Sequence, residues 1–325
     1  MAFAQKRSDE IDGLESQTRP PDGLDREAPP AEVAALARRR PPAGQNQLAV
    51  VIRRFARHRL AMLGLLIFIL LALMALFPGW FSPANPIKVV LSEALEPPGL
   101  THPLGTDSFG RDVLARVVHG SRVSLFVGLT SVLAAMLAGI PIGLIGGFRG
   151  GRLDNILMRF MDAILSFPPL LLAVAIMGSL GADIRNVILA LGLVYTPLFA
   201  RLVRSTVLSA REEDYVLAVR AVGARDRRII FFHILPNVLA PLVVQATATF
   251  SFAIIAEASL SFLGLGVQPP TPSWGQDINE GRRYIQEAWW TVVGPALMIS
   301  LAVLGINFLG DGLRDALDPH MRTAQ

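Results

Sequence analysis

The chain has no cysteine among its 325 residues, and its only lysines are Lys6 and Lys88. Without thiols it can form neither disulfides nor thiolate metal sites. A nucleotide-binding P-loop needs a lysine directly after a glycine, because that lysine neutralises phosphate oxygens, and neither lysine stands there. We therefore expect no cofactor in this chain, so that any use of ATP and magnesium depends on a partner protein.

Charged residues are also scarce. They make up 17% of the sequence, whereas soluble domains usually contain about a quarter. Hydrophobic residues make up 52%, so the chain offers apolar surface to something other than water. The net charge is +4, and the arginines stand at the ends of apolar runs rather than in one basic patch. This pattern argues against nucleic-acid binding and is typical of a membrane protein.

The sequence contains no recognisable catalytic constellation. Its five histidines show no metal-ligand spacing, and neither His-Glu-x-x-His nor Gly-x-Ser-x-Gly occurs. We expect no metal site, no catalytic residue and no enzymatic activity in this chain.

Apolar runs that are nearly free of charge predict an all-α, polytopic membrane protein with about six transmembrane helices. A helix needs about 20 apolar residues to cross a bilayer. Six such runs in one chain make buried helices of a soluble protein a poor alternative. The runs cover residues 60–77, 123–148, 163–182, 186–200, 234–256 and 288–310, and the fourth is the shortest.

The arginines predict how these spans are oriented. Four arginines stand directly before the first span, and three lie between the second and third spans. The fourth span continues around Arg201 to Val203, and six arginines lie between it and the fifth. Cytoplasmic loops carry the excess of positive charge. The amino end, the second loop and the fourth loop are therefore expected in the cytoplasm, and an even number of spans places the carboxyl end there too.

The same pattern divides the chain into five parts. The first is rich in Pro and charged residues and too poor in apolar residues to fold alone. The predicted parts are a disordered cytoplasmic tail (1–47), a first transmembrane helix with its anchor (48–81), an extracytoplasmic segment (82–122), a core with five transmembrane helices (123–310) and a cytoplasmic tail (311–325).

The fourth loop, residues 206–236, has the pattern of two capped helices. Acidic residues at 212–214 favour a helix start, because negative charge suits the amino end of a helix dipole. Gly223 is expected to end that helix. Asp226 is expected to cap a second short helix, which ends before Pro236. An ordinary amphipathic connector is the alternative interpretation.

This loop resembles the EAA loop of permease subunits in binding-protein-dependent ABC importers. That pattern is Glu-Ala-Ala, three residues, Gly, nine residues, Ile, one residue, Leu-Pro. The matching positions are Ala218, Gly223, Leu235 and Pro236. The departures are Leu217, Val219 and His233, and histidine at the last position is usual in the dipeptide and oligopeptide subfamily.

Six further segments resemble the C-type permease subunit of dipeptide and oligopeptide importers. They are GTDSFGRDVLARVVHGSRVSL (105–125), LSFPPLLLAVAI (165–176), ARLVRSTVLSAREEDYV (200–216), HILPNVLAPLVV (233–244), EASLSFLGLGVQPPTPSWG (257–275) and NFLGDGLRDALDP (307–319). The resemblance covers about residues 53–322. It implies a MetI-like type I ABC importer permease fold and, for residues 123–310, a permease core.

The resemblance also implies partners. These are a second, homologous permease subunit that forms a heterodimer with this chain, two ABC ATPase subunits that bind ATP and magnesium, an extracytoplasmic peptide-binding protein, and membrane lipid. It implies a multi-pass protein of the bacterial cytoplasmic membrane that forms half of the pathway for di- and oligopeptides.

In this family the fourth loop couples the permease to an ATPase. The positions expected to do so are Leu217, Ala218, Val219, Arg220, Gly223, Ala224, Arg225, Asp226, Leu235 and Pro236. Because Leu217 replaces the usual glutamate, we expect an apolar contact with the ATPase there. The arginines have lipid headgroups as alternative partners.

Two further sets of residues are weaker candidates. Glu257 stands at the outer end of the fifth predicted span, and Asn307 lies within the sixth. Polar groups at membrane depth face a cavity or another helix, so these two residues either line the pathway or hold helices together. Asp107, Arg111 and Asp112 lie in the extracytoplasmic segment and either contact the binding protein or fix the loop by ion pairs.

Three other functions stay open. Related permeases share these motifs and import nickel, glutathione or opine-like compounds. An ion-coupled secondary carrier would need carboxylates within the spans, and the predicted spans offer only Glu257, at the end of the fifth. A membrane scaffold without transport would leave the capped fourth loop unexplained.

Overall fold

The computed structural model describes residues 47–317. The chain divides into two compact units, Met1–Val50 and Val51–Gln325, and of the first unit only residues 47–50, at the start of a helix, are described. The predicted disordered tail and the end of the predicted carboxyl tail therefore fall almost wholly on residues outside the described part. The description below concerns the second unit.

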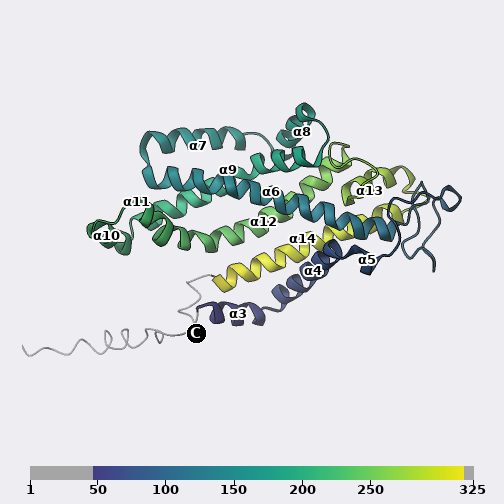
Figure 1. Cartoon of the computed structure of the whole chain (residues 1–325), viewed down its shortest axis with the longest axis horizontal. Coiled ribbons are helices and arrows are strands. Elements are labelled where there is room, and N and C mark those ends of the chain that lie inside the picture. The colour runs from purple at the N-terminus through teal and green to yellow at the C-terminus, as the bar shows by residue number, and fades with distance from the viewer. Residues whose placement is uncertain (1–46, 318–325) are drawn as a thin grey trace, which may run out of the picture. The chain divides into compact units, whose positions relative to one another are not determined.

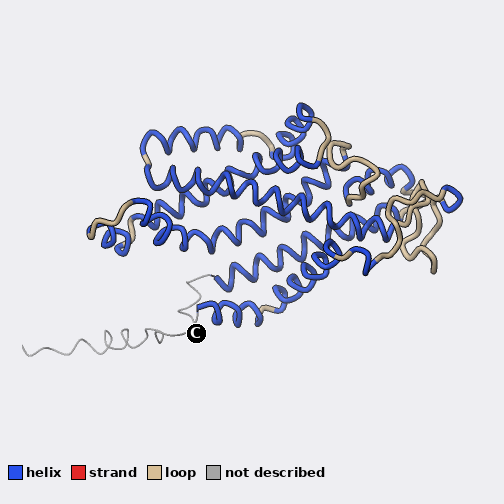
Figure 2. Tube along the Cα trace, in the orientation of Figure 1, coloured by secondary structure: helices blue, strands red, loops and turns tan. Residues whose placement is uncertain are grey.

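The described residues form helices joined by turns and loops, and they contain no strand (Figure 2). In chain order the elements are α3 (Gln47–Arg57), α4 (Arg59–Leu76), α5 (Pro78–Phe81), η1 (Leu91–Glu93), α6 (Val113–Arg149), α7 (Gly151–Leu165), α8 (Pro169–Leu180), α9 (Ile184–Arg211), α10 (Asp214–Ala221), α11 (Asp226–Ile229), η2 (Ile230–Ile234), α12 (Leu235–Phe262), α13 (Trp274–Gly281), η3 (Arg282–Tyr284) and α14 (Trp290–Leu317).

Five helical stretches among the described residues are long and apolar enough to cross a membrane: α4, α6, α9, the stretch Asp226–Phe262 and α14. A sixth candidate is the pair α7 and α8, which is bent by 88°. The prediction of an all-α chain with about six spans is confirmed. The third predicted run, 163–182, is wrong as a single straight helix, because it contains the break at residues 166–168, where Pro168 and Pro169 cannot continue helix α7.

Two spans are longer than their charge-free runs. Helix α6 begins at Val113, ten residues before the apolar run that starts at 123. Asp112 caps this start by accepting a hydrogen bond from the amide of Ala115. Helix α9 continues past residue 200 to Arg211. The arginines on both extensions have partners within the chain: Arg122 donates to backbone carbonyls at the end of α4. The others pair with carboxylates, so these charges do not end the helices.

Glycines allow α6 and α9 to pack at close range. Gly139, Gly143 and Gly147 recur every fourth residue and so share one face of α6. A Cβ atom added at Gly143 would lie 2.5 Å from the carbonyl oxygen of Ala200, and one added at Gly147 would lie 2.9 Å from that of Arg204. Such small residues let the backbones of membrane helices approach. The α6–α9 pair forms the centre of the core.

Helices α4 and α14 form a second close pair (Figure 1). A Cβ atom at Gly64 would lie 2.6 Å from the carbonyl oxygen of Gly305. The opposite face of α4 is apolar and exposed, as at Leu66 (63%) and Ile69 (46%). Exposed leucine and isoleucine on a helix of this length fit contact with lipid.

The short helices lie at opposite ends of this unit. Helix α13 and the loops between α5 and α6 gather at one end, and α10 with α11 gathers at the other (Figure 1). The long helices run between the two ends. The candidate coupling loop and the extracytoplasmic segment are therefore separated by the length of the bundle.

Candidate functional site

The fourth loop forms a compact turn between α9 and α12. Helix α9 ends at Arg211, and α10 starts at Asp214 after Glu213, which adopts extended backbone as the residue before the helix. Asp214 stands in the first turn, where its charge favours the helix dipole. The predicted helix start at the acidic run is confirmed.

Gly223 ends α10 in the way that the sequence predicts. Its φ is +84°, a conformation that residues with a side chain rarely adopt. The amide of Gly223 donates to the carbonyl of Arg220 at 3.0 Å, and the amide of Ala224 donates to that of Val219 at 3.2 Å. A Cβ atom added at Gly223 would meet nothing within 4 Å. Backbone conformation alone, and not crowding, therefore requires glycine here.

The second half of the loop differs from the prediction. Asp226 is the first residue of α11 rather than its cap, because Arg225 occupies the capping position and makes no side-chain bond there. The helix does not end before Pro236. It continues through the π-helical turn η2 into α12, so that Asp226–Phe262 is one helical stretch. Pro236 follows the π-helical turn closely, and this local break in the α-helical hydrogen-bond pattern accommodates a residue without an amide hydrogen.

Three buried side chains fix the loop to the bundle. Val216 of α10, Ile229 of α11 and Ile234 of η2 are fully buried in the main core. The amide group of Asn237 also donates to the hydroxyl of Tyr215 at 2.7 Å, which ties α12 to α10. These anchors were not predicted from the sequence, although Val216 and Val219 are spaced like one buried helix face.

The predicted coupling residues fall into two groups. Val219, Ala224 and Leu235 pack partly buried against the core. The exposed ones are Leu217, Ala218, Arg220, Gly223, Arg225, Asp226 and Pro236. Leu217 is 46% exposed and Val222 is 84% exposed, so α10 presents apolar surface beside charged surface. The guanidinium of Arg220 lies 5.8 Å from the ring centre of Phe148, which joins α10 to the end of α6.

Ion pairs hold α7 against α9 near the same end. Arg204 of α9 donates to both carboxylate oxygens of Asp154 of α7, at 2.5 and 2.6 Å. Arg201 donates to Asp162 at 2.5 Å. Because carboxylates on α7 pair with Arg201 and Arg204, α9 can continue as a helix past these arginines.

At the other end, the extracytoplasmic candidates are engaged within the chain. Asp107 accepts hydrogen bonds from the amides of Phe109 (2.8 Å) and Arg111 (3.0 Å) and from the guanidinium of Arg111 (2.5 Å). Arg111 also pairs with Glu280. Asp107, Arg111 and Asp112 are all buried. Their geometry fits fixing of the loop, and a contact with a binding protein stays a prediction.

Asp112 does more than cap α6. His102 lies 2.8 Å from its second oxygen and 3.4 Å from Glu93. The hydrogen bond that His102 donates to Asp112 raises the pKa of His102, and the charges of Asp112 and Glu93 raise it further. The imidazole therefore joins the segment before α6 to the cap of α6.

Glu257 and Asn307 bond to neighbouring helical residues. Glu257 is fully buried, and one of its oxygens accepts from the hydroxyl of Ser261 at 2.8 Å. Asn307 of α14 accepts from the hydroxyl of Ser251 of α12 at 2.9 Å. These contacts fit helix packing, and a role in lining the pathway stays a prediction.

Comparisons with known proteins agree with this geometry. Residues 139–323 match the family described as "Binding-protein-dependent transport system inner membrane component". The chain belongs to this family. Residues 46–98 match the "N-terminal TM domain of oligopeptide transport permease C". It is thus a multi-pass permease of the bacterial inner membrane, and ATPase subunits and a binding protein are the general partners in its family.

Relatives at moderate identity cover most of the chain. The dipeptide transport system permease protein DppC of Alkalihalophilus pseudofirmus is 45% identical over 271 residues, which are 83% of this chain and 89% of that protein. The di/tripeptide transport system permease protein DppC of Pseudomonas aeruginosa is 46% identical over 276 residues (83% and 91%). The dipeptide transport system permease protein DppC of Escherichia coli is 44% identical over 274 residues (82% and 91%).

Solved structures show the same fold at lower identity. The MetNI methionine ABC transporter in an inward facing conformation aligns with a TM-score of 0.52 and 22% identity, covering 62% of this chain and 96% of that chain. The predicted MetI-like fold is therefore confirmed.

Proposed function

We propose that the chain is a permease subunit of an ATP-driven, binding-protein-dependent importer of dipeptides and oligopeptides. The observation that carries this proposal is the capped, Gly223-centred turn between α9 and α12, at the end of the bundle opposite α13. The peptide cargo is supported by the names of the relatives, which are dipeptide and di/tripeptide permeases. In this proposal the chain supplies half of the pathway and a second, homologous permease supplies the other half.

The coupling role belongs to the exposed face of α10. Leu217 is an exposed apolar side chain on this short helix, and the exposed Val222 directly follows the helix. Buried Val216 fixes the helix to the core. Such a helix can move as a rigid unit, so that a movement of a docked ATPase is passed on to α9 and α12. ATP and magnesium are bound by the two ATPase subunits, and this chain contributes no nucleotide site and no catalytic residue.

We place the coupling loop in the cytoplasm and α13 outside. Arginines support this orientation, because Arg220, Arg225, Arg227 and Arg228 all lie in the loop. The residues before α4 and after α14 then face the cytoplasm as well. Exposed leucines of α4 contact lipid.

Uptake by the reconstituted importer tests this function. The complete chain is placed in liposomes with its second permease, its ATPase subunits and ATP inside, and the binding protein is added outside with a labelled dipeptide. We expect uptake that requires ATP and every subunit. Glutathione and nickel serve as alternative cargoes. Uptake by this chain alone, driven by an ion gradient, would contradict the proposal, and uptake of nickel or glutathione instead of peptide would overturn the cargo.

A further inference from the structure

Five charged side chains, four of them buried, form a cluster at the α13 end, hereafter the outer cluster. Its members are Asp107 and Arg111 of the loop before α6, Arg116 of α6, and Asp277 and Glu280 of α13. Arg116 donates to one oxygen of Asp277, through Nε at 2.9 Å and also through Nη2. Arg111 joins Asp107 to Glu280. The cluster is therefore the main polar connection between α6 and α13.

The outer cluster has more acid than base. Its three carboxylates and two guanidiniums sum to one negative charge when all are ionised. Asp277 is incompletely hydrogen-bonded, because its second oxygen, Oδ2, is buried and has no hydrogen-bond partner. A buried carboxylate oxygen without a donor is costly, and adding a proton removes that cost.

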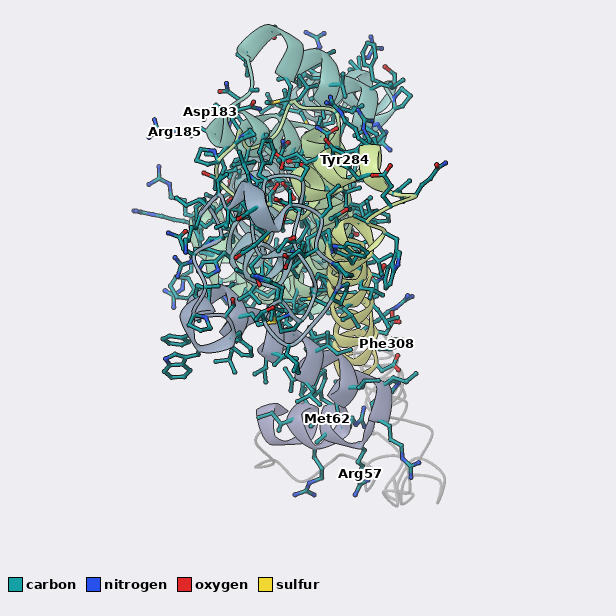
Figure 3. All side chains as sticks on the ribbon, turned by 90° about the vertical axis from the view of Figure 1, so that its right-hand side faces the viewer. Arg57, Met62, Asp183, Arg185, Tyr284 and Phe308 are labelled. Carbon is teal, nitrogen blue, oxygen red and sulfur yellow. The ribbon has the colours of Figure 1, made fainter. Side chains whose placement is uncertain are left out.

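Other groups around Asp277 do not neutralise it. Glu280 of α13 adds negative charge to its surroundings, and Glu257 of α12 is a further carboxyl group close to it. Tyr284 of η3 (labelled in Figure 3) and Thr291 of α14 line the same small cavity. That cavity holds about 10 Å³, which is roughly the room of one water molecule. Water can therefore carry a proton to Asp277, while no further cation of the described residues lines the cavity.

Helix α13 has little freedom beyond this contact. Trp274 is fully buried, and its indole donates to the carbonyl of Val117 in α6 at 3.0 Å. A Cβ atom at Gly275 would lie 2.3 Å from the carbonyl oxygen of Ala258 in α12. The start of α13 is thus packed, whereas its charged face depends on the balance within the outer cluster.

We propose that Asp277 is a proton-binding site through which pH sets how firmly α13 is held against α6. Protonation of Asp277 makes the outer cluster neutral and satisfies the buried Oδ2 position through the cavity. Ionisation leaves an excess negative charge between the two helices. This property goes beyond import itself, and its test does not depend on the cargo.

The sign of the effect follows from the titration of Asp277. Burial raises the pKa of Asp277 from 3.8 to about 6, although Arg116 lowers it. The docked form of α13 therefore binds the proton more tightly than a released form with an ordinary pKa. The free-energy contribution of this proton to docking is complete below pH 3.8, and it is lost as the pH rises through about 6. Between pH 5 and pH 7.5 the ratio of docked to released α13 should fall about tenfold.

The absence of cysteine allows a specific probe. Asn279 of α13 is partly exposed, so Asn279→Cys accepts a nitroxide label without competition from other thiols. The labelled full chain, assembled with its partner subunits in nanodiscs, is measured by electron paramagnetic resonance from pH 5 to pH 8. We expect the mobile fraction of the label to rise with pH, with a midpoint near pH 6. The ratio of immobile to mobile label should fall about tenfold between pH 5 and pH 7.5.

Three variants separate this inference from a general effect of pH. Asp277→Asn keeps the shape and should leave the label immobile at every pH. Glu280→Gln, which removes negative charge beside Asp277, should move the midpoint to lower pH. Glu287→Gln changes an exposed carboxylate at the same end and should titrate like the parent chain. An unchanged titration in Asp277→Asn, or no titration in the parent chain, would overturn the proposal, whether or not peptide uptake is observed.

Discussion

Gly143 of α6 and Ala200 of α9 lie so close that a Cβ atom at position 143 would stand 2.5 Å from the carbonyl oxygen of Ala200. Gly143→Ala should therefore destabilise the chain by about 1–3 kcal/mol, because neither backbone can move without disturbing the core. Gly178→Ala in α8 is the matched control, since nothing lies within 4 Å of its added Cβ atom. Thermal unfolding of the two purified variants in detergent measures the difference. Equal unfolding midpoints would contradict the close packing of α6 on α9.

Arg116 lies within 4.0 Å of all three carboxylates of the outer cluster and is 3% exposed. Arg116→Met should cost about 3–5 kcal/mol, because it leaves buried carboxylates without their partner. Arg283→Met, an exposed arginine at the same end, should change stability by less than about 0.5 kcal/mol. Adding Asp277→Asn to Arg116→Met should recover part of the loss. Unfolding temperatures that do not distinguish the two arginine variants would show that the cluster contributes nothing to stability.

His102 should contribute stability that depends on pH. The pKa of His102 is raised by its hydrogen bond to Asp112, so the folded chain binds the proton more tightly than the unfolded chain does. This stabilisation is complete below about pH 6.5 and is lost as the pH rises through the raised value. His102→Gln should therefore lower the unfolding temperature more at pH 5.5 than at pH 9. A loss of the same size at both values would point to packing rather than charge.

The exposed face of α10 should meet an ATPase subunit. Leu217→Cys provides a single thiol, and the side chain it replaces is 46% exposed. In the assembled importer we expect a thiol-reactive crosslinker to join this position to an ATPase subunit. Leu100→Cys, at a fully exposed position between α5 and α6, should give no such product and should react with an impermeant reagent from outside intact cells. The reverse pattern would place the loop on the wrong side of the membrane.

The sequence predicts the helices well where apolar runs are long and less well where charges interrupt them. The start of α6 could not be predicted because Arg116 and Arg122 interrupt the apolar sequence, and a charged residue in such a stretch usually marks the end of a membrane span. The structure shows why the helix continues, since Arg116 pairs with Asp277 and Arg122 donates to the carbonyls of Ala75 and Leu76 at the end of α4. Contacts over such separations cannot be inferred from local pattern.

The candidate site follows a similar division. Gly223 could be predicted, because a left-handed turn after a short helix leaves few other choices. The continuation of α11 into α12 could not, since the sequence around Pro236 resembles a helix end and only the π-helical turn before it lets the helix pass. Of the outer cluster, Asp107 and Arg111 were candidates for ion pairs from the sequence alone. Their partners on α6 and α13 were missed, because Asp277 and Glu280 stand in a loop-like stretch with no spacing that pairs them with α6.

Coupling by the fourth loop is tested most directly at Gly223, by the ratio of dipeptides imported to ATP hydrolysed in proteoliposomes. Gly223→Val places a branched side chain at φ +84°, which costs roughly 1–2 kcal/mol or more and distorts the turn. Gly223→Asn is the matched control, because asparagine tolerates this conformation and no neighbour crowds it. The account predicts that Gly223→Val hydrolyses ATP with little import, whereas Gly223→Asn keeps most of the parent ratio. If Gly223→Val imported as many dipeptides per ATP hydrolysed as the parent chain does, the assignment of this loop as the coupling element would be contradicted.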